Sequence, residues 1–152
     1  MNAEKFLKSY DGTRIYYRII RKKKPFLFFV HGLSGNCSGW KYQLDFFERL
    51  GYSTITMDIR GHGYSEIPKE KDGFKLEAFV QDINDILKKE KINKIVLIGH
   101  CFGGIVCERF CSLFPKKVEK LILINTGYKN PYTETAVKGI GKLIWVLKAF
   151  YA

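Results

Sequence analysis

The sequence predicts an α/β protein with a mostly parallel sheet and flanking helices. Short apolar runs typical of strands buried on both faces occur at residues 26–30, 52–57 and 95–98. Between them lie longer segments whose apolar residues recur at helical spacing. Strands that alternate with helices favour parallel pairing with right-handed crossovers.

The other elements follow in chain order. A hairpin is expected around Asp11-Gly12, a dipeptide typical of tight turns, with strands over residues 5–9 and 14–20. A first helix is expected to end at Gly51, and its apolar positions are Trp40, Leu44, Phe47 and Leu50. The later predictions are a helix over 76–87, a helix over 104–114, a strand over 118–125 and a last helix over 136–150.

Composition favours one globular domain, because 46% of the 152 residues are hydrophobic and 27% are charged. The net charge is +11, and its only dense basic cluster, residues 21–25, is interpreted as a solvated turn between two strands. Aromatic residues do not interleave with this cluster, so no nucleic-acid partner is expected.

Four cysteines and no secretory leader pattern predict reduced thiols and a cytoplasmic location; they are Cys37, Cys101, Cys107 and Cys111. Cys107 and Cys111 are expected to be core residues on the helix over 104–114. No membrane span is expected, because the most apolar tail segment, 143–152, is short and contains Lys148.

The most informative motif is the pentapeptide Gly99-His100-Cys101-Phe102-Gly103, placed between a predicted strand and a predicted helix. This spacing is typical of a nucleophile elbow, in which glycines let a strand and a helix approach closely around a strained residue. The side chain of that residue then lies at the positive end of a helix dipole, which favours a thiolate. Cys101 is therefore the candidate nucleophile.

Three motifs follow three successive predicted strands: His31-Gly32-Leu33, then residues 58–65 with Asp58, Arg60 and His62, then the elbow. The ordered set resembles the α/β-hydrolase superfamily, and within it the lipase/esterase-like branch that bears a cap. The resemblance implies an α/β-hydrolase fold core over residues 1–130, truncated after its sixth strand, and the start of a cap helix over 131–152.

The resemblance also implies roles for individual residues. Cys101 would attack the carbonyl of an ester, thioester or lactone, and the backbone N–H groups of Leu33 and Phe102 would form the oxyanion hole. The supporting residues would be His31, Gly32, Gly99, His100, Gly103, Asp58, Arg60 and His62. The implied partner is a small-molecule acyl substrate, with no cofactor and no metal.

The sequence departs from the family pattern because no Asp and no His follows Cys101, where the family places the acid and the histidine of its triad. The chain alone is therefore expected to be an incomplete hydrolase. Either a complementing C-terminal chain or self-association through the exposed edge strand at 118–125 would complete it. The alternative is a catalytically silent binding module or degenerate fragment. A third reading is a thiol that passes its acyl group to another nucleophile.

Overall fold

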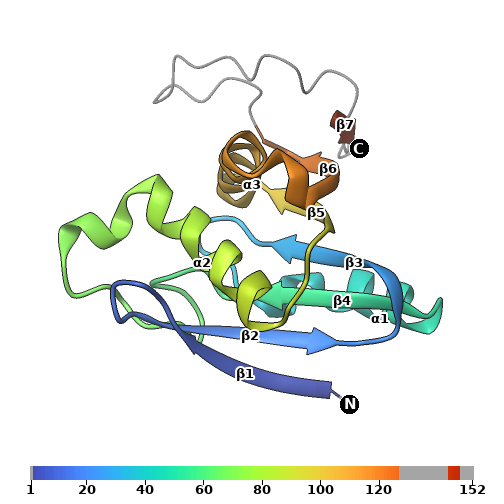
Figure 1. Cartoon of the computed structure of the whole chain (residues 1–152), viewed down its shortest axis with the longest axis horizontal. Coiled ribbons are helices and arrows are strands. Elements are labelled where there is room, and N and C mark those ends of the chain that lie inside the picture. The colour runs from blue at the N-terminus through green and yellow to red at the C-terminus, as the bar shows by residue number, and fades with distance from the viewer. Residues whose placement is uncertain (1, 127–143, 148–152) are drawn as a thin grey trace.

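The computed structural model describes residues 2–126 and 144–147, which form a seven-stranded sheet flanked by helices (Figure 1). The strands are β1 (Asn2–Lys8), β2 (Arg14–Ile20), β3 (Lys23–Val30), β4 (Tyr52–Met57), β5 (Ile95–His100), β6 (Val118–Ile124) and β7 (Ile144–Leu147). Their order is β1-β2-β4-β3-β5-β6-β7; β1 and β2 are antiparallel to their neighbours, and the others pair in parallel. The predicted α/β class is confirmed.

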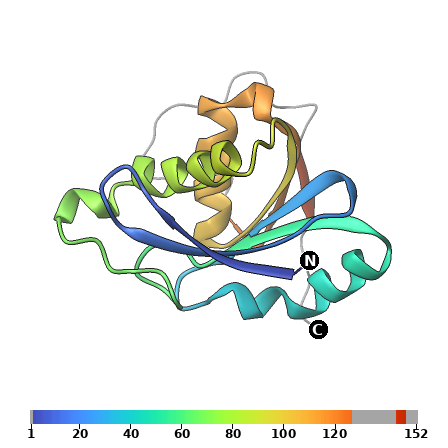
Figure 2. The ribbon, with the colours of Figure 1, turned by 60° about the horizontal axis from the view of Figure 1, so that its bottom comes forward.

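Helices cover both faces of the sheet. The α-helices are α1 (Lys41–Arg49), α2 (Leu76–Lys89) and α3 (Phe102–Leu113), with short 3₁₀ turns at Cys37–Trp40, Lys71–Phe74 and Pro115–Lys117. Figure 2 shows α1 on one side of the sheet and α2 and α3 on the other. Alternate residues of the central strands supply the two cores: Phe28 and Val30 lie in the core with α2 and α3, and Leu27 and Phe29 lie in the core with α1. Burial on both faces explains why these strands are apolar throughout.

The predicted hairpin is confirmed, with Lys8 opposite Arg14 and a positive φ of 86° at Gly12. The basic segment 21–25 is only partly a turn, because β3 already begins at Lys23, which pairs with Tyr52 before a register shift to Phe26. Residues 21–24 are all exposed. The strand begins early because β4 offers backbone partners there, which hydropathy does not reveal.

The last predicted helix is wrong where the structure describes it. Ile144–Leu147 form β7, which pairs in parallel with β6 along Leu121–Ile124; the rest of the predicted helix, and most of the cap segment expected over 131–152, lie outside the described residues. The run Ile-Trp-Val-Leu has high strand propensity, and the edge of β6 supplies unpaired backbone groups for it. Because β7 occupies this edge, the expectation of a bare β6 edge is also wrong.

Among the described residues, no helix has the length and apolar character needed to cross a bilayer.

The loop after α2 is anchored to the hairpin by Glu90, whose side chain is only 5% exposed. Its carboxylate accepts hydrogen bonds from the Tyr17 hydroxyl at 2.6 Å, the Lys5 ammonium at 2.9 Å and the Arg21 guanidinium at 2.7 Å. Burial alone would raise the pKa of Glu90, but these three donors outweigh it and lower the pKa to about 2.

This lowered pKa predicts an acid-sensitive contribution to stability. The contribution is complete above the unfolded-state pKa of about 4.3 and is lost as the pH falls from there toward about 2. We expect Glu90→Gln to make the free energy of unfolding less dependent on pH across that window. Urea titrations between pH 2 and pH 6 measure it, and an unchanged pH dependence in the variant would contradict the assignment.

Candidate active site

Cys101 lies between the end of β5 and the start of α3, with φ 51° and ψ −122°. A positive φ in a non-glycine residue costs on the order of 1–3 kcal/mol and persists only where the surroundings enforce it. Here the Cys101 N–H donates to the Ile124 carbonyl at 3.1 Å, and the Cys101 carbonyl accepts from the Gly104 N–H and the Thr126 hydroxyl at 2.9 and 2.8 Å. The Cys101 residue is exposed and its thiol is free, so the turn presents an accessible thiol at the start of a helix.

Close packing around the elbow requires its glycines. A Cβ atom on Gly103 would lie 2.4 Å from the His31 carbonyl oxygen and 2.5 Å from the Val30 carbonyl oxygen. A Cβ atom on Gly99 would lie 2.7 Å from the Cα atom of Gly104. These distances leave no room for a side chain, so α3 can start directly against β3 and β5 only with glycine at both positions.

The loop after β3 lies against the elbow. A Cβ atom on Gly32 would be only 2.9 Å from the Cβ atom of Cys101, so the backbone of this loop passes directly beside Cys101. The N–H groups of Leu33 and Phe102 donate to no acceptor among the described residues. Both therefore remain free to donate to a ligand. The Leu33 side chain is exposed.

Two of the three histidines have both ring nitrogens engaged. Nε2 of His31 accepts from the Ile59 N–H at 3.0 Å, so its proton is on Nδ1, which donates to the Gly32 carbonyl at 2.7 Å. Burial lowers the pKa of His31 and keeps it neutral. His62 spans two loops in the same way, because Nε2 accepts from the Ser34 N–H at 3.3 Å and Nδ1 lies 3.2 Å from the Arg60 carbonyl. Neither ring offers a free nitrogen to Cys101.

His100 has a different environment. Its half-buried ring lies edge-on to Trp40, with 6.5 Å between ring centroids, on the side of the sheet covered by α1. A Cβ atom on Gly32 would lie 3.3 Å from its Nδ1, so the ring packs beneath the loop after β3. Its ring nitrogens make no hydrogen bond to a described residue.

Asp58 joins two loops at the end of β4. Its Oδ1 accepts from the Cys37 N–H at 2.7 Å, and its Oδ2 accepts from the Tyr64 N–H at 2.8 Å. Burial, followed by the nearby Asp58 carboxylate, raises the pKa of the Cys37 thiol to about 12. Cys37 therefore stays a thiol near neutral pH, in contrast to a reactive cysteine.

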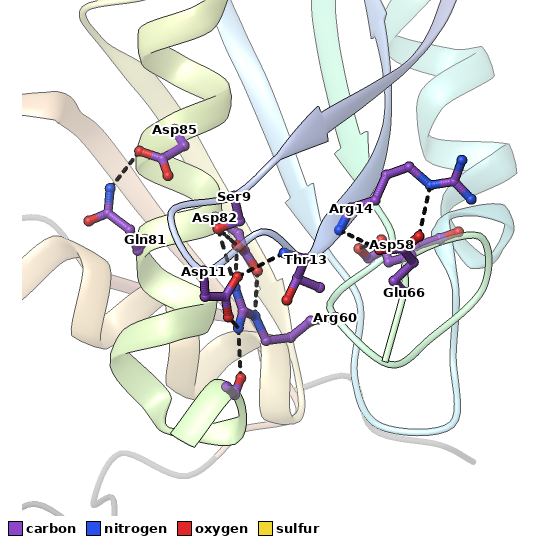
Figure 3. Close-up of polar contacts among 12 residues, drawn as sticks. Ser9, Asp11, Thr13, Arg14, Asp58, Arg60, Glu66, Gln81, Asp82 and Asp85 are labelled. Atoms are coloured by element: carbon purple, nitrogen blue, oxygen red, sulfur yellow. Dashed lines mark hydrogen bonds and ion pairs between the residues drawn. The ribbon is translucent and has the colours of Figure 1, made fainter. Parts of the chain in front are cut away.

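Arg60 is fully buried and ties the loop after β4 to three other segments (Figure 3). Its guanidinium donates to both carboxylate oxygens of Asp82 on α2, at 2.8 and 2.7 Å. It also donates to Asp11 in the hairpin and to the Gly73 carbonyl, both at 2.7 Å. The bidentate geometry with Asp82 is the strongest form of charge-assisted hydrogen bond.

Sequence reasoning missed two residues near the site. Asp82 is the buried partner of Arg60, and its position on the apolar face of an amphipathic helix was a detectable anomaly. Thr126, whose hydroxyl holds the Cys101 carbonyl, had no distinguishing pattern. Cys107 and Cys111 are buried, as predicted. Within residues 2–126 and 144–147, no group of three or more His, Cys, Asp or Glu side chains could hold a metal ion.

The known proteins that this chain matches are considerably longer than the chain itself. Human protein ABHD8 is 41% identical over 101 residues, which make up 66% of this chain and 23% of that protein. Human epoxide hydrolase 4 is 33% identical over 135 residues, 88% of this chain and 37% of that protein. The chain thus spans well under half the length of the curated relatives it matches.

Solved structures share the fold. A hydrolase from Pseudomonas aeruginosa superimposes with a TM-score of 0.77 at 27% identity, covering 84% of this chain and 48% of its own. An epoxide hydrolase from Vigna radiata gives a TM-score of 0.78 at 21% identity, covering 87% and 43%. The family model for the alpha/beta hydrolase fold matches residues 25–152. With the strand order, the elbow and these matches agreeing, the chain belongs to the alpha/beta hydrolase fold family.

Proposed function

We propose that this chain is the nucleophile-bearing part of a hydrolase that acts on esters, thioesters or lactones through an acyl-cysteine at Cys101. The observation that supports it is the exposed Cys101 thiol on a strained turn, directly beside a loop whose Leu33 N–H is free. The substrate class is a small acyl compound, and the free cysteines fit a cytoplasmic location.

The first step is nucleophilic attack. The Cys101 thiolate forms a C–S bond to the carbonyl carbon, and the carbonyl π electrons move to the oxygen. The N–H groups of Leu33 and Phe102 donate to this oxyanion, and they require no reorganisation to do so. Collapse of the tetrahedral intermediate breaks the bond to the leaving group and leaves a thioester on Cys101.

The second step, hydrolysis of the thioester, needs a base to activate water. His31 and His62 are engaged in holding loops, and the His100 ring packs against Trp40 beneath the loop after β3. A missing general base slows such a step by about 10²–10⁴-fold. A complementing chain that supplies a histidine and an acid would restore turnover; self-association is the other way to supply them.

Several relatives carry the name epoxide hydrolase, which raises epoxide opening as a competing reaction. A cysteine argues for the acyl substrate instead. Attack of a thiolate on an epoxide carbon breaks the C–O bond and leaves a thioether, which water does not cleave. An acyl-cysteine is a thioester, which water cleaves, so only the acyl route returns the free Cys101 thiol.

A silent binding module is the alternative function, and it is favoured by the absence of any free imidazole nitrogen aimed at the thiol from His31 or His62. The two functions differ in the reactivity of Cys101, because a binding module needs no reactive thiol.

Intact-mass spectrometry after treatment with p-nitrophenyl acetate tests the proposal. We expect a single acetyl adduct on Cys101, its loss in Cys101→Ala, and its retention in Cys37→Ala, whose removed thiol is held protonated by its surroundings. An unmodified chain would support the binding module. Adducts spread over several cysteines would indicate nonspecific acetylation and reject the proposal.

A further inference from the structure

The outer face of α1 and its C-terminal cap carry an apolar stripe formed by Tyr42, Phe46 and Leu50, which are 81%, 56% and 50% exposed. Residues four apart lie on one face of a helix, so these three side chains line up along its length. The opposite face of α1 already supplies the core through Leu44 and Phe47. Nothing in the described fold therefore requires the stripe to be apolar.

A basic turn lies at one end of this stripe. Residues 21–24, Arg-Lys-Lys-Lys, run from the end of β2 into the first two residues of β3 and are all exposed. The Lys22 ammonium donates to the Glu48 carbonyl, and the Lys23 N–H donates to the Gly51 carbonyl at 3.1 Å. The turn is thus held against the C-terminal end of α1, as the two ribbon views also show (Figures 1 and 2).

The positive charge beside the stripe is poorly neutralised. Of the two carboxylates on α1, Glu48 is occupied by Arg18 at 3.1 Å and by the Thr54 hydroxyl at 2.7 Å. Asp45 is the only carboxylate of α1 left exposed. The exposed basic residues of the turn and of α1 outnumber it; they are Lys22, Lys23, Lys24, Lys41 and Arg49. An apolar strip flanked by an excess of lysine and arginine is complementary to an anionic surface with an apolar interior.

We propose that the α1 stripe and the basic turn dock this chain onto an anionic lipid surface. Tyr42, Phe46 and Leu50 enter the headgroup boundary, and the lysines of the turn lie among the lipid phosphates. Nucleic acid fits less well, because Leu50 offers no stacking surface and the Phe46 ring is already edge-on to Phe47. The basic turn lies where the parallel strands begin, whereas Cys101 lies where β5 ends.

Flotation of the 152-residue chain with phosphatidylcholine vesicles, with and without phosphatidylserine, tests the proposal. We expect binding only to the vesicles that contain phosphatidylserine, and weaker binding as salt is added. Lys22→Gln/Lys24→Gln should reduce the partition coefficient about tenfold or more, since each lysine near such a surface contributes about 1 kcal/mol. Phe46→Ser should reduce it as well.

Matched controls lie in the loop after β4, at the end of the sheet where the parallel strands end. Lys69→Gln/Lys71→Gln removes the same charge as the lysine variant of the turn. Ile67→Ser removes an apolar side chain from a residue that is 72% exposed. Both should bind like the unmodified chain. An equal loss in the controls would show that only net charge matters and would overturn the proposal, as would binding to neutral vesicles or no binding at all.

Tryptophan fluorescence measures whether the stripe inserts into the lipid surface. In a Phe46→Trp variant, the added tryptophan emission should move to shorter wavelength on anionic vesicles, relative to the unmodified chain. An unchanged emission would overturn the insertion of α1. Binding to duplex DNA that depends on Lys22 and Lys24 but not on Phe46, without vesicle binding, would assign the surface to nucleic acid instead.

Discussion

Treatment of the isolated chain with p-nitrophenyl acetate is expected to release a burst of product close to one equivalent per chain, followed by a much slower steady phase. The burst reports acylation of Cys101, and the slow phase reports hydrolysis of the thioester with neither His31 nor His62 available to activate water. Stopped-flow absorbance at the wavelength of p-nitrophenolate measures both. Steady turnover without a burst would contradict the missing-base argument.

The variant Cys101→Ser sharpens this test. We expect serine at this position to abolish the burst. A serine hydroxyl needs a general base, which contributes about 10²–10⁴-fold, whereas cysteine is the less dependent of the two on such a base because sulfur is intrinsically more nucleophilic. His31 and His62 are both fully hydrogen-bonded, so neither can serve. A reactive serine variant would show that another group, with His100 the first candidate, acts as base.

Added hydroxylamine separates acyl transfer from hydrolysis. If the acyl-cysteine accumulates, a strong external nucleophile should accelerate the slow phase by attacking the thioester directly, beyond the rate that Cys101→Ala shows with the same nucleophile. Cys37→Ala is the control and should behave like the unmodified chain, because the Cys37 thiol is held protonated by burial and by Asp58. An unaccelerated slow phase would mean that the burst does not arise from an accessible thioester.

The central sheet could be predicted from sequence because its strands are buried on both faces. A run such as Phe-Leu-Phe-Phe-Val at residues 26–30 admits few other environments, and its flanking glycine-rich loop marks where it ends. The elbow could also be predicted from a local pattern, since Gly99, Cys101 and Gly103 lie within five consecutive residues. Local patterns therefore specified both the core strands and the position of the thiol.

β7 could not be predicted in the same way. Its four residues fit either a helix or a strand by hydropathy, and the choice depends on hydrogen bonds offered by β6, more than twenty residues earlier in the chain. The loop contacts at the site have the same origin. The sequence marks Arg60 and His62 as loop residues, but their partners Asp82 and Ser34 are supplied by other elements of the fold. Strand propensity and motif spacing carry no information about such pairings.

Asp82→Asn is expected to destabilise the chain by about 3–5 kcal/mol, because it leaves the Arg60 charge buried without its main partner. Both side chains are 0% exposed, so water cannot replace the lost carboxylate. Asp11 still reaches Arg60, but its side chain is 22% exposed and contacts a single guanidinium nitrogen. Urea denaturation followed by circular dichroism measures the change.

Two further variants decide whether the loss comes from the buried charge. Asp72→Asn makes the same chemical change in an exposed ion pair with Lys75 and should have no measurable effect. Arg60→Met/Asp82→Leu removes both charges, and it should cost less than Asp82→Asn alone, because no unpaired charge remains in the core. If the double variant is as unstable as the single one, the loss of stability does not come from an unpaired buried charge. It then comes from the lost contacts of Arg60 with the hairpin and with the Gly73 carbonyl.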